Sequence, residues 1–492
     1  MDRQNSILII MKNKLITSSL AAAVLLGGPA AAQTWQEPLA YSQGNSCGLA
    51  KEGMVVTAGR VFSVGSRQEQ GLVVATETKA TLTIHNQGSG TPVSRIDFQP
   101  NPNDNYYHMG IALRGTVGVV TIGTHLGPFG SEAFVANWDL NGNLVGTPLM
   151  LPGSALVSGA TFAFAAEIVM QSPTIGFGCA HVTGATPHTV VFRLNFLPTG
   201  PVLDTSPTLW PPVGSFMGGV RGVANTTPGA PMLPGGWSPL YMMPVPGQIA
   251  VNATHIYLGA NNATTNNGQL SRWTIGGLAA TPVNSVAIGA PGSATDIREL
   301  ALGTTAVYVV GTTLTGGGPL SWLGAAHGIG AAFPALTWSW GIGVPPQGQP
   351  SDIEVANVGG IPHIYICGHE TTGADNVRHF TLPALGAGVT PAGGNWNFGT
   401  WPVDIDLGMA GAIGTQQFVT GMVASFSSPV HNVEGRDQSG GPLFGPSLVP
   451  LLPGANLSGG SAIRFWPAGN AIFTNGNGMH PSGDYVEVAR FQ

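Results

Sequence analysis

Charged side chains are scarce in this chain of 492 residues and make up only 8% of it, against a usual share of roughly 25%. Beyond residue 32 only two lysines remain, Lys51 and Lys79, and acidic residues outnumber basic ones. Binding to nucleic acid or to an anionic membrane surface requires clustered basic side chains that neutralise phosphates. The composition therefore argues against both kinds of partner.

Cysteine and long hydrophobic runs are also in short supply. The three cysteines, Cys47, Cys179 and Cys367, are too few and too scattered for a disulfide framework, although one disulfide is permitted. No apolar run beyond the N-terminus is long enough to cross a bilayer. Long helical periodicity is absent as well, which argues against alternating strands and helices.

The N-terminus has the pattern of a signal peptide. Lys12 and Lys14 precede the apolar stretch "LITSSLAAAVLLGG", and small residues follow at Ala30 and Ala32, the positions that a signal peptidase reads. We predict cleavage between Ala32 and Gln33, which leaves residues 33 to 492 as one exported domain, periplasmic or extracellular. The first ten residues lack this pattern, so Met11 is an alternative start.

Glycine, with 73 residues, is abundant and recurs in a regular pattern. Eight short apolar segments, among them "AVYVVGT" and "HIYICGH", are each interpreted as a strand that ends at a glycine. These glycines are Gly65, Gly123, Gly178, Gly259, Gly311, Gly368, Gly421 and Gly476. Their spacings are 58, 55, 81, 52, 57, 53 and 55 residues. The chain is therefore predicted to consist of repeated units.

Each unit contains further short apolar segments that are separated by turn residues, which indicates four strands per unit. This pattern is typical of a β-propeller blade. The fold class predicted is all-β, a single propeller of eight four-stranded blades, or of seven if the weak first unit is not a blade. The last unit has only three strands, and "TWQEPLA" at residues 34 to 40 resembles a fourth strand. We expect this N-terminal segment to close the ring.

The interval between Gly178 and Gly259 is longer than the others because of an insertion at about residues 197 to 247. It is unusually apolar for a loop and includes Trp210 and Trp237. An insertion packed on the surface of the propeller is the favoured interpretation. A lid or a partner-binding element is the alternative, since long loops in compact domains are often functional.

The segments "IAVNATHIYLG", "LALGTTAVYVVG" and "FVANWDLNGNLVG" resemble the repeats of bacterial secreted β-propeller proteins, known as SBBP-like repeats. The turn sequence Asp-x-x-Gly-Asn of those repeats is missing here. The resemblance implies a propeller fold and an extracellular setting. It implies no catalytic residue, because such folds support many unrelated functions.

If each glycine marks the end of a second strand, the residues that follow it gather on one face of the ring. Residues that lead into the first strands are expected on the same face. The ligand-binding candidates, with the two tryptophans of the insertion, are His125, His181, His369, Glu370, Asp296, Asp352, Asp404, Trp210 and Trp237.

A metal site has weaker support from the sequence. Cys179 with His181 and Cys367 with His369 share a Cys-x-His spacing that suits zinc or copper. The two pairs belong to the third and sixth units, so structural roles are favoured. The aspartates are favoured as turn-fixing residues over ligands of Ca²⁺. We therefore expect no cofactor.

Two functions remain open at the level of the sequence. The first is a secreted binding or scaffolding module for a glycan, a protein or a surface polymer. The alternative is an extracellular hydrolase or lyase whose catalytic groups come from several blades. A His–carboxylate pair or paired carboxylates in a central pocket favour the enzyme, and dispersal around the rim disfavours it.

Overall fold

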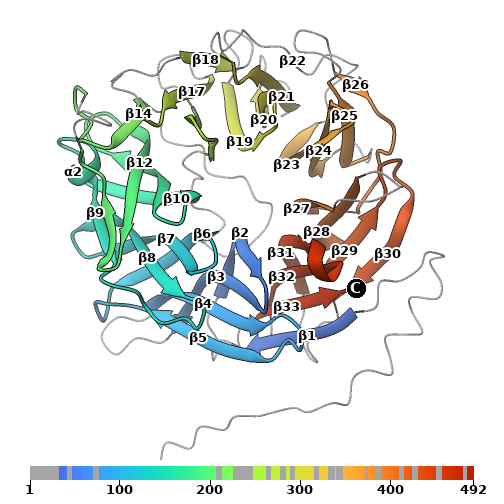
Figure 1. Ribbon diagram of the computed structural model, residues 1–492, viewed down its shortest axis with the longest axis horizontal. Coiled ribbons are helices and arrows are strands. Elements are labelled where there is room, and N and C mark those ends of the chain that lie inside the picture. The colour runs from blue at the N-terminus through green and yellow to red at the C-terminus, as the bar shows by residue number, and fades with distance from the viewer. Residues whose placement is uncertain are drawn as a thin grey trace, which may run out of the picture.

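In the computed structural model, eight antiparallel sheets are arranged as blades around a central axis, as Figure 1 shows. The structure describes residues 33–40, 47–69, 77–206, 213–224, 248–261, 267–276, 284–288, 294–314, 321–330, 338–339, 347–371, 375–382, 389–399, 401–408, 415–423, 430–449, 457–479 and 485–492. The fold is an eight-bladed β-propeller, so the expectation of eight blades is confirmed and seven is excluded.

Within each blade the chain runs outward from the axis, strand by strand. The first strands surround the axis: β2 (Cys47–Thr57), β6 (Asn105–Leu113), β10 (Phe162–Ser172), β15 (Gln248–Val251), β19 (Ala294–Leu302), β23 (Gly348–Val358), β27 (Trp401–Gly408) and β31 (Leu457–Trp466). The second strands contain the repeat glycines: β3 (Arg60–Glu69), β7 (Gly118–Gly127), β11 (Ile175–Thr183), β16 (His255–Asn261), β20 (Ala306–Leu314), β24 (Ile361–Glu370), β28 (Gln416–Val423) and β32 (Ala471–Met479).

The outer half of each blade holds the third and fourth strands. The third strands are β4 (Glu77–Asn86), β8 (Gly130–Asp139), β12 (His188–Leu197), β17 (Gly268–Thr274), β21 (Ser321–Gly328), β25 (Val377–Thr381), β29 (Val430–Arg436) and β33 (Tyr485–Phe491). The fourth strands are β5 (Pro92–Phe98), β9 (Leu149–Pro152), β13 (Gly200–Leu203), β18 (Asn284–Ile288), β22 (Trp338–Ser339), β26 (Thr390–Pro391), β30 (Pro442–Leu448) and, in blade 8, β1 (Gln33–Ala40). A short helix, α2 (Gly153–Leu156), and a 3₁₀ turn, η2 (Pro467–Gly469), complete the described elements.

The N-terminal strand closes the ring, as the sequence predicts. β1 pairs antiparallel with β33, so the two ends of the domain share one sheet. Blade 3 departs from the four-strand pattern, because β14 (Val220–Ala224) also pairs with β12. This strand belongs to the insertion, so the described part of the insertion extends the sheet of its own blade.

The unbroken apolar run in β24 is explained by burial on both faces of the sheet. Ile364 and Ile366 pack toward blade 5, whereas Tyr365 and Cys367 pack toward blade 7. Alternating side chains of a strand point to opposite faces, so a strand between two blades is apolar at every position. Each large apolar side chain buried in this way stabilises the fold by about 1.5–3 kcal/mol.

The repeat glycine lies inside each second strand and not at its end, which corrects the sequence interpretation. In β20, a Cβ atom on Gly311 would overlap the carbonyl oxygen of Asp296 in the neighbouring first strand. Directly beyond this contact the first strand bulges, because the register skips Arg298. The position therefore tolerates no side chain. The same contact recurs in blades 2, 6, 7 and 8 at Gly123, Gly368, Gly421 and Gly476.

Replacement of this glycine tests the constraint. Gly311→Ala is expected to lower the free energy of unfolding by about 1–3 kcal/mol, because a methyl group is forced against backbone that cannot rotate away. Gly276→Ala is the matched control, since a Cβ atom there meets no other atom within 4 Å. Chemical denaturation of both variants provides the comparison. Equal stability of the two variants would contradict the account.

Candidate ligand-binding face

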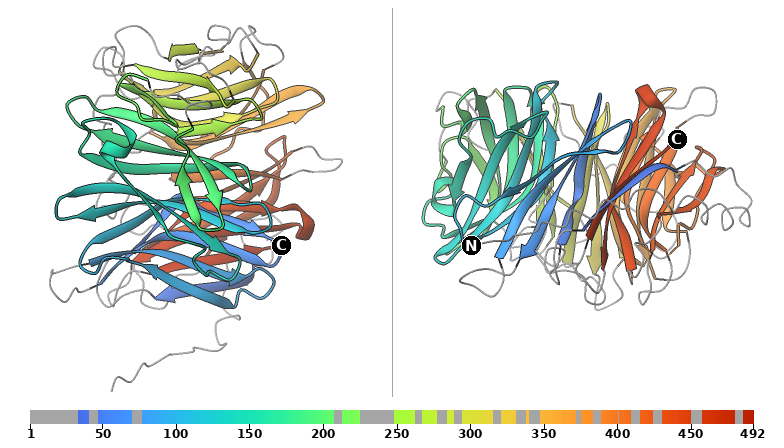
Figure 2. Two further views of the ribbon diagram at one scale, coloured as in Figure 1. Left: turned by 60° about the vertical axis from the view of Figure 1, so that its left-hand side comes forward. Right: turned by 90° about the horizontal axis from the view of Figure 1, so that it is seen from below.

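Strand direction distinguishes the two faces of the ring. We call the face on which first strands begin and second strands end the upper face, and the opposite one the lower face. Seen edge-on in the right-hand view of Figure 2, the strands run from one face to the other. The three candidate histidines lie near the upper face, each opposite the start of a first strand: His125 opposite Tyr106, His181 opposite Phe164 and His369 opposite Gln349.

The expectation that His369 and Glu370 lie beyond the end of the second strand was wrong. Both residues belong to β24, which continues beyond Gly368 and pairs with the first residues of β23. The glycine was misread as a stop because its role, a close approach to the neighbouring strand, depends on a contact that the local sequence does not show. Glu370 is buried, and its carboxylate accepts the backbone N–H of Gln347 at 3.3 Å.

His125 lies between two carboxylates in blade 2. Its Nε2 is 3.0 Å from Oδ2 of Asp104, and its Nδ1 is 3.4 Å from Oε2 of Glu132. The imidazole stacks on the ring of Tyr106, with 4.5 Å between ring centroids. The carboxylates remain partly exposed, at 18% for Asp104 and 35% for Glu132. This cluster therefore offers acceptor oxygens to a ligand on the upper face.

His369 is held by aromatic residues of two neighbouring blades. Its ring stacks on Trp401 of blade 7 with 4.3 Å between centroids, and its carbonyl accepts the indole N–H of Trp322 of blade 5 at 3.0 Å. Burial lowers the pKa of His369, and the nearby Glu370 acts in the opposite direction. The ring and the backbone carbonyl of His369 together join blades 5, 6 and 7.

His181 and the two Cys-x-His pairs do not form a common site. Cys179 and Cys367 are completely buried and located in blades 3 and 6. Burial raises the pKa of the Cys179 thiol well above its usual range, so it is a small apolar core residue. His181 is 2% exposed and neither of its ring nitrogens has a hydrogen-bond partner. Burial lowers its pKa to about 4.

Two of the three candidate aspartates join neighbouring blades. Asp352 of blade 6 accepts the backbone N–H of Ile405 in blade 7 at 3.0 Å. Asp404 of blade 7 accepts the backbone N–H of Ile463 in blade 8 at 2.7 Å and also binds Arg464 at 2.8 Å. Both carboxylates are almost completely buried. They therefore accept backbone N–H groups, as aspartates do in turns, but here they link the first strands of neighbouring blades.

The remaining candidates fall into two groups. Asp296 forms an ion pair with Arg298 at 2.7 Å and accepts a hydrogen bond from the side-chain amide of Asn261 at 2.8 Å. Trp210 and Trp237 lie outside the described residues.

The structure also reveals polar sites that the sequence did not indicate. His431 and Glu487 are both fully buried between blades 7 and 8, with Nδ1 and Oε1 2.8 Å apart. The second ring nitrogen of His431 is 3.0 Å from the hydroxyls of Thr420 and Thr474. These residues lie up to 67 positions apart in the chain, so only the repeat register brings them together.

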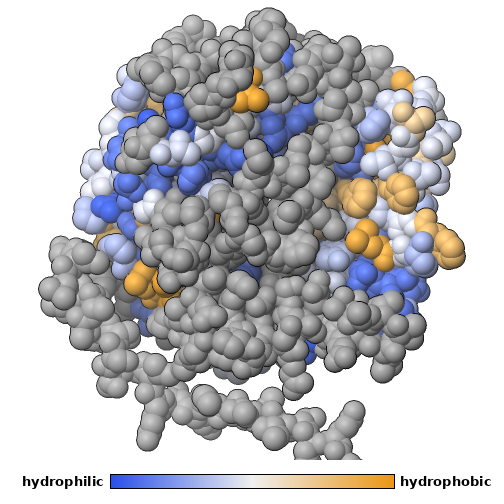
Figure 3. Space-filling model, turned by 180° about the vertical axis from the view of Figure 1, so that it is seen from behind, coloured by the Kyte–Doolittle hydropathy of each residue, from blue (hydrophilic) through white to orange (hydrophobic). Residues whose placement is uncertain are grey.

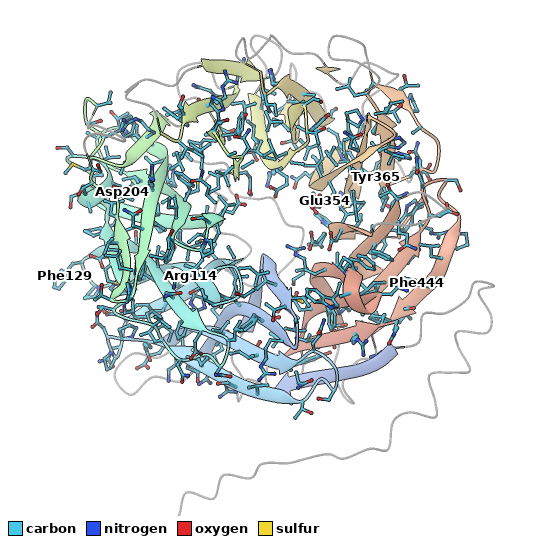
Figure 4. The ribbon with its side chains drawn as sticks, viewed as in Figure 1. Arg114, Phe129, Asp204, Glu354, Tyr365 and Phe444 are labelled. Carbon is cyan, nitrogen blue, oxygen red and sulfur yellow. The ribbon has the colours of Figure 1, made fainter. Side chains whose placement is uncertain are left out.

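Phe129 is a second feature that sequence reasoning missed. It occupies the turn between β7 and β8, and 99% of the residue is exposed. Figure 4 places it at the outer edge of the ring. The signal was present in the stretch "GPFG", where two glycines and a proline predict a tight turn that presents its one large side chain to solvent.

No metal cluster is formed by the part of the chain that the structure describes, in the sense of three or more His, Cys, Asp or Glu side chains brought together. Among the same residues, no helix is long and apolar enough to span a membrane.

No family model matches the chain, and no curated protein matches it. Solved structures resemble it in fold at low identity. Sqt1 from Chaetomium thermophilum bound to the N-terminus of ribosomal protein L10 is 13% identical, with a TM-score of 0.49 over 93% of this chain and 100% of that one. The WD40 domain of SCAP from fission yeast is 8% identical, with a TM-score of 0.43 over 93% of this chain and 98% of that one.

A quinohemoprotein alcohol dehydrogenase from Pseudomonas putida HK5 is 10% identical, with a TM-score of 0.43 over 94% of this chain and 76% of that one. At such identities and TM-scores these likenesses carry no argument about the activity or partner of this chain. The resemblance to secreted propeller repeats is confirmed for the fold, an eight-bladed propeller, and not for that particular family.

The unpartnered His181 predicts a pH effect on stability. Its pKa is about 4 in the folded chain and about 6.5 in the unfolded chain. The unfolded chain therefore binds the extra proton between these values, and stability falls as the pH is lowered from about 6.5 to about 4. His181→Phe removes this contribution, on the order of 3 kcal/mol, because phenylalanine has no group to protonate.

Denaturation at pH 7 and at pH 4.5 measures the effect. We expect His181→Phe to be at least as stable as the wild type at pH 7, since no hydrogen bond is lost, and to lose less stability at pH 4.5. His255→Gln is the control, because His255 is only half-buried and burial lowers its pKa less than that of His181, so a smaller change in pH dependence is expected. An unchanged pH dependence in His181→Phe would contradict the assignment.

Proposed function

We propose that this chain is an exported binding or scaffolding module that holds a glycan, a protein or a surface polymer on its upper face. The observation that carries the proposal is the exposure of Phe129 on a short turn between two well-paired strands. Burial of a phenylalanine side chain stabilises a protein or a complex by about 1.5–3 kcal/mol, and a fully exposed phenylalanine contributes none of this energy. A bound ligand recovers this energy without any change in the fold.

The turn that carries Phe129 is rigidly supported from below. A Cβ atom on Gly127 would lie 3.3 Å from the ring of His125, and one on Gly130 would lie 3.2 Å from the ring of Phe162. The backbone of the turn therefore rests on two rings. Phe162 is itself 38% exposed, so two aromatic side chains are available on adjoining blades. Little conformational entropy is lost when such a preorganised surface binds.

The chemistry around the two rings defines the kind of ligand. Asp104 and Glu132 offer carboxylate oxygens next to the apolar surface of Phe129 and Phe162. A ligand with an apolar face and flanking hydroxyl or N–H donors complements this arrangement, as a sugar ring or a polypeptide segment does. Figure 3 shows further hydrophobic residues along the side of the ring formed by blades 2 and 3.

Export is the second part of the proposal and rests on residues 1 to 32, which lie outside the described residues. The apolar stretch flanked by Lys14 and the small residues before Gln33 support it. N-terminal sequencing of the exported protein is expected to begin at Gln33. A mature protein that retains the apolar stretch would contradict this part.

A hydrolase or lyase is the second candidate function. The pair of His125 and Asp104, 3.0 Å apart, favours it as a base and the carboxylate that orients it. The other histidine and acidic candidates belong to other blades. Asp352 and Asp404 are engaged in hydrogen bonds between blades 6, 7 and 8.

Replacement of Phe129 tests the proposed function. The purified mature chain is applied to an array of polysaccharides and to an array of peptides. Phe129→Ser is expected to weaken binding roughly 10- to 100-fold, the equivalent of the apolar burial that is lost. Val117→Ser is the matched control, because Val117 is also exposed, at 55%, but lies on the lower face.

Binding that is equal in Phe129→Ser and in the wild type, or absent for every member of both arrays, would overturn the proposal. Degradation of an array member by the wild type and not by His125→Ala would establish the enzyme instead.

A further inference from the structure

Two histidines face each other in blade 6 on the lower face, away from the proposed binding surface. His363 lies near the start of β24 and His379 in β25, and their Nδ1 and Nε2 atoms are 2.8 Å apart. Both residues are buried at the boundary with blade 7, at 8% and 1% exposure. Figure 4 shows Tyr365, from the same strand as His363, inside this blade. Neither histidine is a candidate from sequence, because each lies within a short apolar strand.

The orientation of a neighbouring amide shows whether Nδ1 of His363 carries a hydrogen. The side chain of Gln438, from blade 7, reaches this nitrogen with its Nε2 at 3.1 Å. Its Oε1 accepts the backbone N–H of Thr415 at 3.2 Å. A backbone N–H can only donate, so the amide cannot be reversed without losing this hydrogen bond. The amide nitrogen therefore donates, and His363 Nδ1 presents a lone pair.

The hydrogen-bond partner of His379 shows which of its ring nitrogens carries a hydrogen. Its Nδ1 is 3.1 Å from the carbonyl oxygen of Gly393, which can only accept, so this nitrogen carries a hydrogen. A histidine ring is mostly neutral at pH 7, because its ordinary pKa is about 6.5. A neutral imidazole has one N–H, and Nε2 of His379 is then left with a lone pair that faces His363 Nδ1, whose own lone pair is shared with the amide of Gln438.

Two lone pairs at 2.8 Å repel each other unless a cation lies between them. We propose that His363 Nδ1 and His379 Nε2 form a site for a divalent transition-metal ion of the Zn²⁺ or Cu²⁺ class. Neutral imidazole nitrogens are preferred ligands of these ions. With metal–nitrogen distances of about 2.0–2.1 Å, tetrahedral coordination requires the two nitrogens to move apart to about 3.3 Å. Water is proposed for the remaining coordination positions.

The surroundings hold the two rings in place for such a role. The ring of Tyr365 stacks on His379 with 4.3 Å between centroids. The backbone N–H of His379 donates to Oδ1 of Asn395 at 2.9 Å. Ring orientation fixed by outer contacts is a general property of metal-binding histidines.

Titration of the metal-free protein tests the proposal. The mature chain is treated with EDTA, dialysed and titrated with ZnCl₂ or CuSO₄ in a calorimeter. We expect one ion per chain, and at least about tenfold weaker binding in His363→Ala and in His379→Ala. Cu²⁺ bound to the wild type is expected to show coupling to two imidazole nitrogens in its electron paramagnetic resonance spectrum.

Two further variants separate a lost ligand from a damaged fold. Gln438→Ala removes the competing hydrogen-bond donor from His363, so metal affinity is expected to stay equal or to rise. His255→Ala removes a histidine outside the pair, and affinity is expected to be unchanged. The proposal is overturned if no ion binds with one-to-one stoichiometry, which would leave a shared proton as the occupant. Equal affinity of His363→Ala and the wild type would also overturn it.

Discussion

The structure depends on a contact that five blades share, between the repeat glycine of the second strand and the backbone of the first strand. At Gly311 and its equivalents the two backbones approach so closely that no side chain fits, and the first strand bulges directly beyond this point. A bulge turns backbone groups away from the regular ladder. In blades 7 and 8 the N–H groups of Ile405 and Ile463, which follow the bulges, are accepted by Asp352 and Asp404 of the preceding blades.

This arrangement explains why the acids of the first strands are poor catalytic candidates. A carboxylate that accepts a buried backbone N–H is required by the fold, since an unsatisfied buried donor costs about 1–3 kcal/mol. Groups free for ligands are found instead where the chain turns, at Phe129 beside the carboxylates around His125. The lower face carries a different chemistry in the facing pair of His363 and His379. The two proposed sites thus lie on opposite faces of the ring.

The sequence was sufficient for the architecture, because strand periodicity and the repeat spacing are local signals. It predicted eight blades and the closure of the ring by residues 34 to 40, which β1 provides. From the sequence we interpreted the repeat glycine as a strand end. Gly368 is instead required by its close contact with Gln349 of the neighbouring strand, which the local sequence does not show. The pairing of His363 with Gln438, 75 residues away, was equally invisible, since it depends on how blades 6 and 7 face each other.

The most direct measurement is hydrogen exchange, followed by mass spectrometry, in variants that lack one inter-blade carboxylate. Asp404→Ala is predicted to accelerate exchange in residues 457 to 466 and to leave residues 401 to 408 unchanged, because Asp404 accepts the N–H of Ile463. Asp352→Ala is predicted to act on residues 401 to 408 through Ile405. The account would be contradicted if exchange rose in neither segment, or if each variant raised it equally in both segments. Either result would mean that these carboxylates do not hold the bulged first strand of the next blade.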